Sequence, residues 1–178
     1  MDLLGQRLTV NELPVLVAGE DTRQQAVSFV SASRRGRIPL LMQLTTESFP
    51  NVDDHSLQVG LADVFGEVKA DESIPFLLRH LILRRSEGAD FAPWTKIDPV
   101  VLRSFPCIRA LVSIGARASK ALIKEFAGGN DSEGRLAAIF VVAHIPGVPE
   151  ASGFLKGVSN PTVLERYYID RGLDLQKY

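Results

Sequence analysis

The sequence predicts an all-α fold built from about four pairs of helices stacked along the chain. Two observations carry this prediction. Apolar residues in segments such as 57–68 recur at the helical period of about 3.6 residues rather than alternating as they do in strands. Short motifs also recur at a spacing that suits a repeated unit of two helices.

The first helix of a pair is indicated by three segments that begin with Asp and carry Gln or Arg four residues later. These segments are 21–30, 54–65 and 131–142. An aspartate suits the N-cap of a helix, because its carboxylate accepts hydrogen bonds from otherwise unpaired N–H groups and favours the positive end of the helix dipole. Each Asp is therefore predicted to open a helix.

The second helix of a pair is indicated by a recurring Ile-Pro dipeptide. It occurs at Pro39 within 36–44 and at Pro75 within 71–81, and the two prolines are 36 residues apart. Proline is tolerated in the first turn of a helix, because the N–H that it lacks has no partner there. The spacing fits a repeat of two helices.

The third and fourth pairs follow less regularly. Asp98 is predicted to cap the third pair, Pro106 to kink or split its first helix, and Gly115 to end that helix in a left-handed conformation. A second helix is expected over 118–126, before Gly128-Gly129. The fourth pair is expected over 131–158, with its turn at Pro146-Gly147.

Glycine spacing predicts one insertion. Gly66 and Gly115 are 49 residues apart, whereas Gly115 and Gly147 are 32 apart, an excess of 17. The segment near 84–98 shows no helical periodicity, so the insertion is placed there. The chain is predicted to be a single domain, 1–178, with an N-terminal cap over 1–20, repeats over 21–158 and a C-terminal cap or tail over 159–178.

The pattern Asp-x3-Arg/Gln, then Gly, then Ile-Pro-x-Leu-Leu resembles the bacterial HEAT-like repeat, the type also found in phycobiliprotein lyases. The best-matching stretches are 54–81 and 109–158. The chain departs from the repeat at Pro106, at Lys120 in place of the repeat's proline, and in the turn 146–149. The resemblance implies a right-handed α/α superhelix, a HEAT-like solenoid with an interaction surface, and it specifies no ligand.

Composition excludes several classes of protein. With 20 Lys and Arg against 21 Asp and Glu, the net charge is −1, so no global field attracts nucleic acid or a membrane. One cysteine, Cys107, permits neither an internal disulfide nor a cysteine-based zinc site. Without a leader-like start or a long apolar run, a cytoplasmic protein with no membrane partner is expected.

No residue pattern indicates catalysis. His55, His80 and His144 are far apart and lack the spacing of metal ligands, and Cys107 lies on an apolar face, where a buried, inert thiol is expected. The segment 128–131 resembles a phosphate-binding loop only in its glycines, because the P-loop lysine is missing. No catalytic residue, cofactor or metal is therefore predicted.

Seven residues are candidates for binding a partner. Four are basic and belong to the second helices, which line the concave face of a HEAT-like stack; the other three are apolar or aromatic. They are Arg79, Arg84, Lys120 and Lys124, then Phe76, Leu83 and Trp94.

For each set, an ordinary structural role is the alternative to partner binding. The basic residues either form a positive groove or simply complement helix dipoles and keep the surface soluble. Phe76 and Leu83, seven residues apart, form an apolar strip if both are exposed, or otherwise contact neighbouring repeats. Trp94, the single tryptophan, either binds a partner or packs against the repeats.

The leading hypothesis is a non-enzymatic protein- or peptide-binding scaffold that uses the concave face. The alternative is a nucleic-acid-binding or DNA-repair helical-repeat protein. A lyase subunit that positions a pigment ranks third, because only 7% of residues are aromatic and no Cys/His pair suggests pigment handling.

Overall fold

The computed structural model describes residues 12–85, 94–126 and 132–177. Within these residues the chain forms eleven α-helices and no strand, which confirms the all-α prediction. In chain order the helices are α1 Leu13–Ala18, α2 Arg23–Ala32, α3 Arg34–Leu44, α4 Asp54–Glu67, α5 Ile74–Arg79, α6 Asp98–Ser104, α7 Pro106–Ile114, α8 Ala116–Phe126, α9 Ser132–His144, α10 Ala151–Gly157 and α11 Val163–Leu175. A 3-10 turn, Asp71–Ser73, precedes α5.

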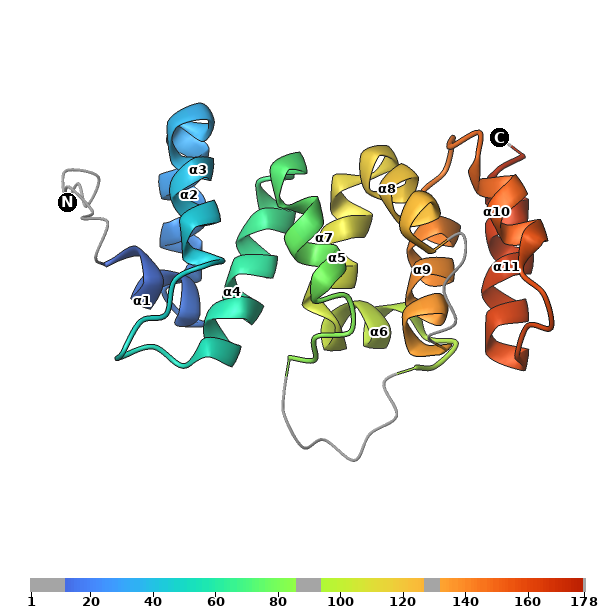
Figure 1. Ribbon diagram of the computed structural model, residues 1–178, viewed down its shortest axis with the longest axis horizontal. Coiled ribbons are helices and arrows are strands. Elements are labelled where there is room, and N and C mark those ends of the chain that lie inside the picture. Colours follow the sequence, from blue (N-terminus) through green and yellow to red (C-terminus); the bar gives the residue numbers. More distant parts are fainter. Residues whose placement is uncertain (1–11, 86–93, 127–131, 178) are drawn as a thin grey trace.

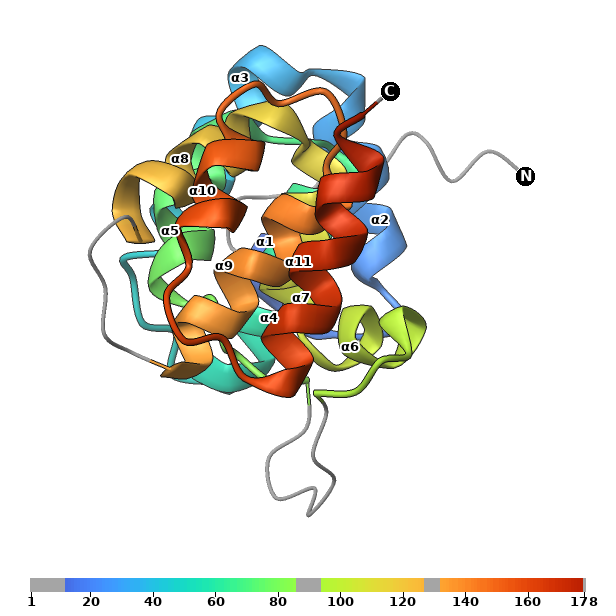
Figure 2. The ribbon, with the colours of Figure 1, turned by 90° about the vertical axis from the view of Figure 1, so that its right-hand side faces the viewer.

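The helices are arranged in rows along the long axis of the molecule (Figure 1). A central row contains α1, α4, α7, α9 and α11, and each of these helices contacts the next one in the row. Figure 2 looks along the rows: a second row of α5, α8 and α10 lies on one side of the central row, and α2 and α6 lie on the other. The central row is therefore covered from both sides.

The apolar core follows the central row. In α9, every residue from 137 to 143 is buried, and in α4 every residue from 59 to 66 is buried. A helix that is enclosed on all sides is apolar around its whole circumference, unlike a surface helix with one apolar stripe. Enclosure by neighbouring helices explains why both segments read as nearly continuous apolar runs.

Two glycines in α4 allow its neighbours to approach very closely. A Cβ atom on Gly60 would lie 1.9 Å from the carbonyl oxygen of Val17 in α1. A Cβ atom on Gly66 would lie 2.8 Å from the Cα atom of Ala110 in α7. Only glycine fits where two backbones meet in this way.

Several helix starts differ from those predicted. Helix α2 begins at Arg23 and its N-cap is Thr22, so Asp21, the residue predicted to open it, lies outside the helix. Helix α3 begins at Arg34, so Pro39 lies inside it rather than in its first turn. The N-cap of α4 is Asp53, whose carboxylate accepts from the Ser56 N–H at 2.6 Å, rather than Asp54. Asp98 is the first residue within α6, not its cap, because its side chain bonds to other helices instead.

The predicted break at Pro106 is confirmed. Phe105, with φ −117° and ψ 91°, is extended and separates α6 from α7. Gly115 ends α7 with the predicted positive φ, 87°, but its ψ of −139° lies outside the left-handed helical region that was expected. That combination is open essentially to glycine alone.

The C-terminal segment is a packed helix. Helix α11 contacts α9, and it starts with a capping box in which Thr162 and Glu165 each bond to the other's backbone. In the predicted insertion, residues 94–97 are non-helical, while 86–93 lie outside the described residues. Residues 1–11, the glycines at 128–129 and the expected cap at Asp131 also lie outside them.

Candidate functional site

The apolar strip that required Phe76 and Leu83 to be exposed does not form. Phe76 is only 5% exposed and packs edge-on against Phe65, with ring centroids 5.7 Å apart. Its ring also lies 4.7 Å from that of His80, measured between centroids. Leu83 is half-buried against the core. Phe76 therefore contacts α4 and Leu83 packs against the core, in agreement with the alternative that these two residues are used in packing.

Trp94 also packs inward. Its ring lies 4.6 Å from that of Phe105 and 6.2 Å from that of Phe140, measured between centroids. The indole Nε1 donates to Oε1 of Glu133 in α9 at 3.0 Å, and Arg84 donates to the same oxygen at 3.2 Å. Two of the seven candidates are thus brought together, at a joint between the segment 84–98 and α9.

The other three basic candidates remain on the surface. Arg79 of α5 and Lys120 and Lys124 of α8 are exposed, and α5 contacts α8 within the second row. None of the three forms an ion pair with the described residues. Burial, and then the charge of Arg79, lower the pKa of His80 below its ordinary 6.5, so a neutral imidazole lies beside this surface.

The single thiol is buried, as predicted. Cys107 is fully enclosed, and burial, followed by the nearby charge of Asp63, raises its pKa far above the ordinary value. A thiol that stays protonated is a poor nucleophile. Among the described residues, no group of three or more His, Cys, Asp or Glu side chains is placed to hold a metal ion.

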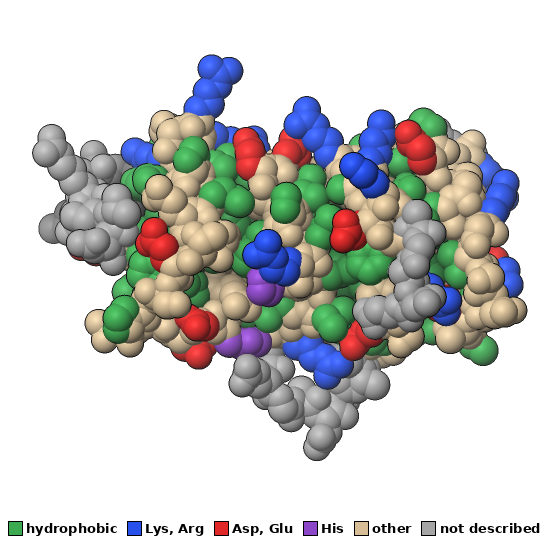
Figure 3. Space-filling model, viewed as in Figure 1, with side chains coloured by type: hydrophobic (Ala, Val, Ile, Leu, Met, Phe, Trp, Pro, Cys, Tyr) green, Lys and Arg blue, Asp and Glu red, His purple; other side chains and the backbone are tan. Residues whose placement is uncertain are grey.

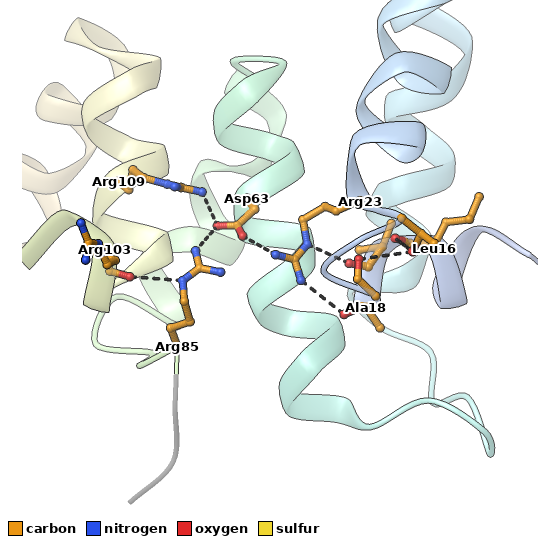
Figure 4. Close-up of polar contacts among 10 residues, drawn as sticks. Leu16, Ala18, Arg23, Asp63, Arg85, Arg103 and Arg109 are labelled. Atoms are coloured by element: carbon orange, nitrogen blue, oxygen red, sulfur yellow. Dashed lines mark hydrogen bonds and ion pairs between the residues drawn. The ribbon is translucent and has the colours of Figure 1, made fainter. Parts of the chain in front are cut away.

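The strongest concentration of charge was not predicted. It surrounds Asp63, which belongs to α4 and is 5% exposed (Figure 4). Its Oδ2 accepts from Arg23 Nη1 at 2.6 Å. Its Oδ1 accepts from Arg85 Nη2 at 2.8 Å and from Arg109 Nη2 at 2.7 Å. These four residues are called the Asp63 cluster below.

Separate elements hold each arginine in place. Arg23 is the first residue of α2, and it also donates to the carbonyl oxygens of Val17 and Ala18, which join α2 to the end of α1. Arg85 follows α5 and donates from Nε to the carbonyl oxygen of Arg103 in α6 at 3.2 Å. Arg109 projects from α7.

The cluster carries more positive than negative charge. Three guanidinium groups face one carboxylate, whereas Glu165 pairs with Arg135 alone. The Nη2 atoms of Arg85 and Arg109 both bond to one oxygen, so they lie no more than 5.5 Å apart, the sum of the two distances. Their mutual repulsion is on the order of 1–3 kcal/mol at this partly exposed position.

The cluster opens to solvent on one side. Exposed fractions of the side chains rise from 13% for Arg23 to 27% for Arg85 and 43% for Arg109, above a carboxylate at 6%. Its contacts with α2 and α6 place it on the side of the central row opposite to α5, α8 and α10. The sequence could have indicated this cluster through Asp63, which lies within the apolar run 61–65. A carboxylate in such a run is buried and therefore needs charged partners.

A second ionic network, around Asp98, joins helices to one another. Asp98 of α6 accepts from Arg171 of α11 and lies 3.1 Å from Nε2 of His144 in α9. Nearby, the Tyr168 hydroxyl donates to the Thr95 carbonyl oxygen, and burial, followed by the charge of Asp98, raises the pKa of Tyr168. These contacts tie three helices together.

A small pocket of about 170 Å³ lies between the end of α3, the start of α4 and α5. Its lining combines apolar side chains with carboxylates, hydroxyls and an imidazole. The lining residues are Leu44, Thr45, Thr46, Glu47, Ser48, Asp54, Leu57, Gln58, Leu61, Phe76 and His80.

Comparison of the chain with family models, curated proteins and solved structures gives no match. None of the helices in the described part of the chain combines the length and the apolar character that a membrane crossing requires.

Proposed function

We propose that this chain is a non-enzymatic binding module for an acidic segment of a protein or peptide. It would be a right-handed α/α superhelix of HEAT-like helix pairs, with its binding surface on α5 and α8 of the second row. The observation that carries the proposal is that Arg79, Lys120 and Lys124 are exposed there and unpaired within the described residues.

Electrostatics supports an acidic partner. The whole chain has a net charge of −1, so any attraction for an acidic segment comes from a local surface. Lys and Arg side chains occur over the second row, with acidic side chains among them (Figure 3). Charges of this kind raise the association rate and select the partner more than they add affinity.

The test is binding of a fluorescent polyglutamate peptide to the full chain, measured by anisotropy at low and physiological salt. The proposal expects saturable binding that weakens with salt, since exposed charges are screened within about 10 Å at 0.1 M. The variant Arg79→Glu/Lys120→Glu/Lys124→Glu is expected to lose this binding.

The matched control reverses three exposed basic residues elsewhere, Arg35, Lys156 and Arg166. It changes the net charge equally, so it should weaken binding much less. Equal loss in both triple variants, or no binding by the unaltered chain, would overturn the proposal.

A nucleic-acid-binding function is the second candidate, and the Asp63 cluster is the observation that favours it. Arginine donates to phosphate oxygens with fixed fork geometry, and several such contacts make nucleic-acid binding steeply salt-dependent. Retention on duplex DNA at low salt would support this function, and absence of retention would end it.

A further inference from the structure

We propose that the Asp63 cluster is a binding site for a dianionic phosphate group, that of a phosphate monoester. The site lies across the central row from the surface of α5 and α8, so it does not depend on the function proposed above. Three lines of observation support it: charge, geometry and access.

The positive charge of the site is not balanced by acidic side chains among the described residues. Three guanidinium groups around one carboxylate leave a surplus of two positive charges, and no other acidic side chain pairs with these arginines among the described residues. A phosphate monoester carries close to two negative charges at neutral pH. A monoester therefore neutralises the cluster, whereas a carboxylate or a phosphate diester supplies only one charge.

The geometry suits a tetrahedral oxyanion. Arg85 and Arg109 reach the same Asp63 oxygen, so their guanidinium groups are held side by side. Among the described residues Arg109 donates only from Nη2, to Asp63, which leaves N–H groups on Nε and Nη1 for a ligand. Oxygens of one phosphate can accept from both guanidiniums at once.

The donors are held in place before any ligand arrives. Arg85 is fixed at two points, by Asp63 and by the Arg103 carbonyl oxygen, and Asp63 is itself buried in α4. Fixing a long side chain in advance removes part of the entropic cost of binding. Arg109, 43% exposed, gives the ligand access from solvent.

A purely structural role is the competing explanation, since the cluster also ties α2, α4, α7 and the segment after α5 together. The two explanations differ in one measurable respect. If the cluster is purely structural, it binds phosphate no better than any exposed arginine does. If it is a binding site, its phosphate binding is saturable and depends on Arg109.

The experiment titrates the full chain with phenyl phosphate, inorganic phosphate, dimethyl phosphate and acetate at constant ionic strength and about pH 7.5, where monoesters are dianionic. Binding is followed by calorimetry and by the arginine Nε–Hε resonances. We expect saturable binding of phenyl phosphate and inorganic phosphate, and binding of the two monoanions at least about tenfold weaker.

Variants locate the binding. Arg109→Gln should weaken phenyl phosphate binding at least about tenfold, the loss of one charge-assisted contact. Arg117→Gln, which alters an exposed arginine paired one-to-one with Asp71, should leave it unchanged. If Arg109→Gln fails to fold, Arg109→Lys serves instead, because it keeps the charge and loses the fork, and weaker binding is again expected.

Three results would overturn the proposal. They are no saturable phosphate binding, equal affinity for dimethyl phosphate and phenyl phosphate, and equal affinity in the Arg109 and Arg117 variants. Duplex DNA that binds through Arg109 while phenyl phosphate does not would also overturn it and would assign the cluster to a diester backbone.

Discussion

Asp63 connects parts of the chain that lie far apart in sequence, because its two oxygens accept from arginines at positions 23, 85 and 109. A buried carboxylate is costly unless it is paired and hydrogen-bonded. The partners are themselves charged and partly enclosed, so removal of the carboxylate leaves them facing one another.

The variant Asp63→Asn is expected to be less stable than the unaltered chain. The change keeps the size of the side chain and removes its charge, so the free energy of unfolding should fall by about 2–3 kcal/mol, the contribution of hydrogen bonds to a charged group. Urea denaturation at neutral pH measures it.

Asp71→Asn is the control for that measurement. Asp71 pairs with Arg117 alone, and that arginine is 75% exposed, so the loss should stay below about 1 kcal/mol. Similar losses in the two variants would show that the Asp63 cluster adds no more stability than an exposed pair.

Among elements, the contact between α4 and α7 depends on a glycine. Gly66→Ala would place a methyl group 2.8 Å from the Ala110 backbone, so the two helices must separate, at a cost of about 1–3 kcal/mol or more. The control is Gly153→Ala in α10, where the new methyl group meets nothing within 4 Å. Thermal denaturation should show Gly66→Ala destabilised and Gly153→Ala unchanged or stabilised, because alanine favours helix; equal destabilisation would contradict this account.

The start of α11 gives a pH-dependent prediction. Burial alone would raise the pKa of Glu165, but hydrogen bonds from Arg135 and Thr162 outweigh it and hold that pKa below its ordinary 4.5. The ionised form is therefore favoured by folding, so this stability is present above about pH 4.5 and is lost as pH falls through the lower folded-state pKa.

Glu165→Gln should consequently destabilise the chain by about 1–3 kcal/mol at pH 7, and the gap from the unaltered chain should close below about pH 4.5. Urea denaturation at several pH values measures the gap. Glu125→Gln on the exposed side of α8 should stay within about 0.5 kcal/mol throughout. A gap for Glu165→Gln that persists undiminished in acid would contradict the argument.

Helix positions were largely predictable, because each helix carries its own apolar period and its own turn residues. Pro106 and Gly115 marked boundaries correctly, since their backbone constraints act locally. The sequence predicts the cap of α4 one residue too late, at Asp54 instead of Asp53. Two adjacent aspartates are equally good caps by residue type, and the hydrogen bond from the Ser56 N–H to Asp53 decides between them.

Over the whole molecule, the central row predicts an uneven distribution of stability. Helix α9 is enclosed between α7 and α11 and buries eight residues, whereas α2 near one end buries only Ala26 and Val30. Regions with few buried contacts open more readily than the core does. Amide hydrogen exchange should therefore be slowest in α9 and much faster in α2; equal protection of both would show that the chain opens only as a unit.

Candidate binding residues were predictable only where the residue type alone indicates whether a side chain is exposed. Arg79, Lys120 and Lys124 lie on the surface as expected of helix-borne basic residues, but Phe76 is buried by α4, a contact that its own helix does not reveal. The arginines of the Asp63 cluster lie 22, 40 and 46 residues from Asp63 in the sequence, and no helical period predicts contacts over such separations.

Trp94 gives this chain a built-in optical reporter. It is the single tryptophan, and its indole lies against Phe105 and Phe140 with its N–H bonded to Glu133. Its fluorescence therefore originates from one joint, where the segment before α6 meets α9. A red shift that precedes the loss of helical circular dichroism would show that this joint opens before the helices unfold.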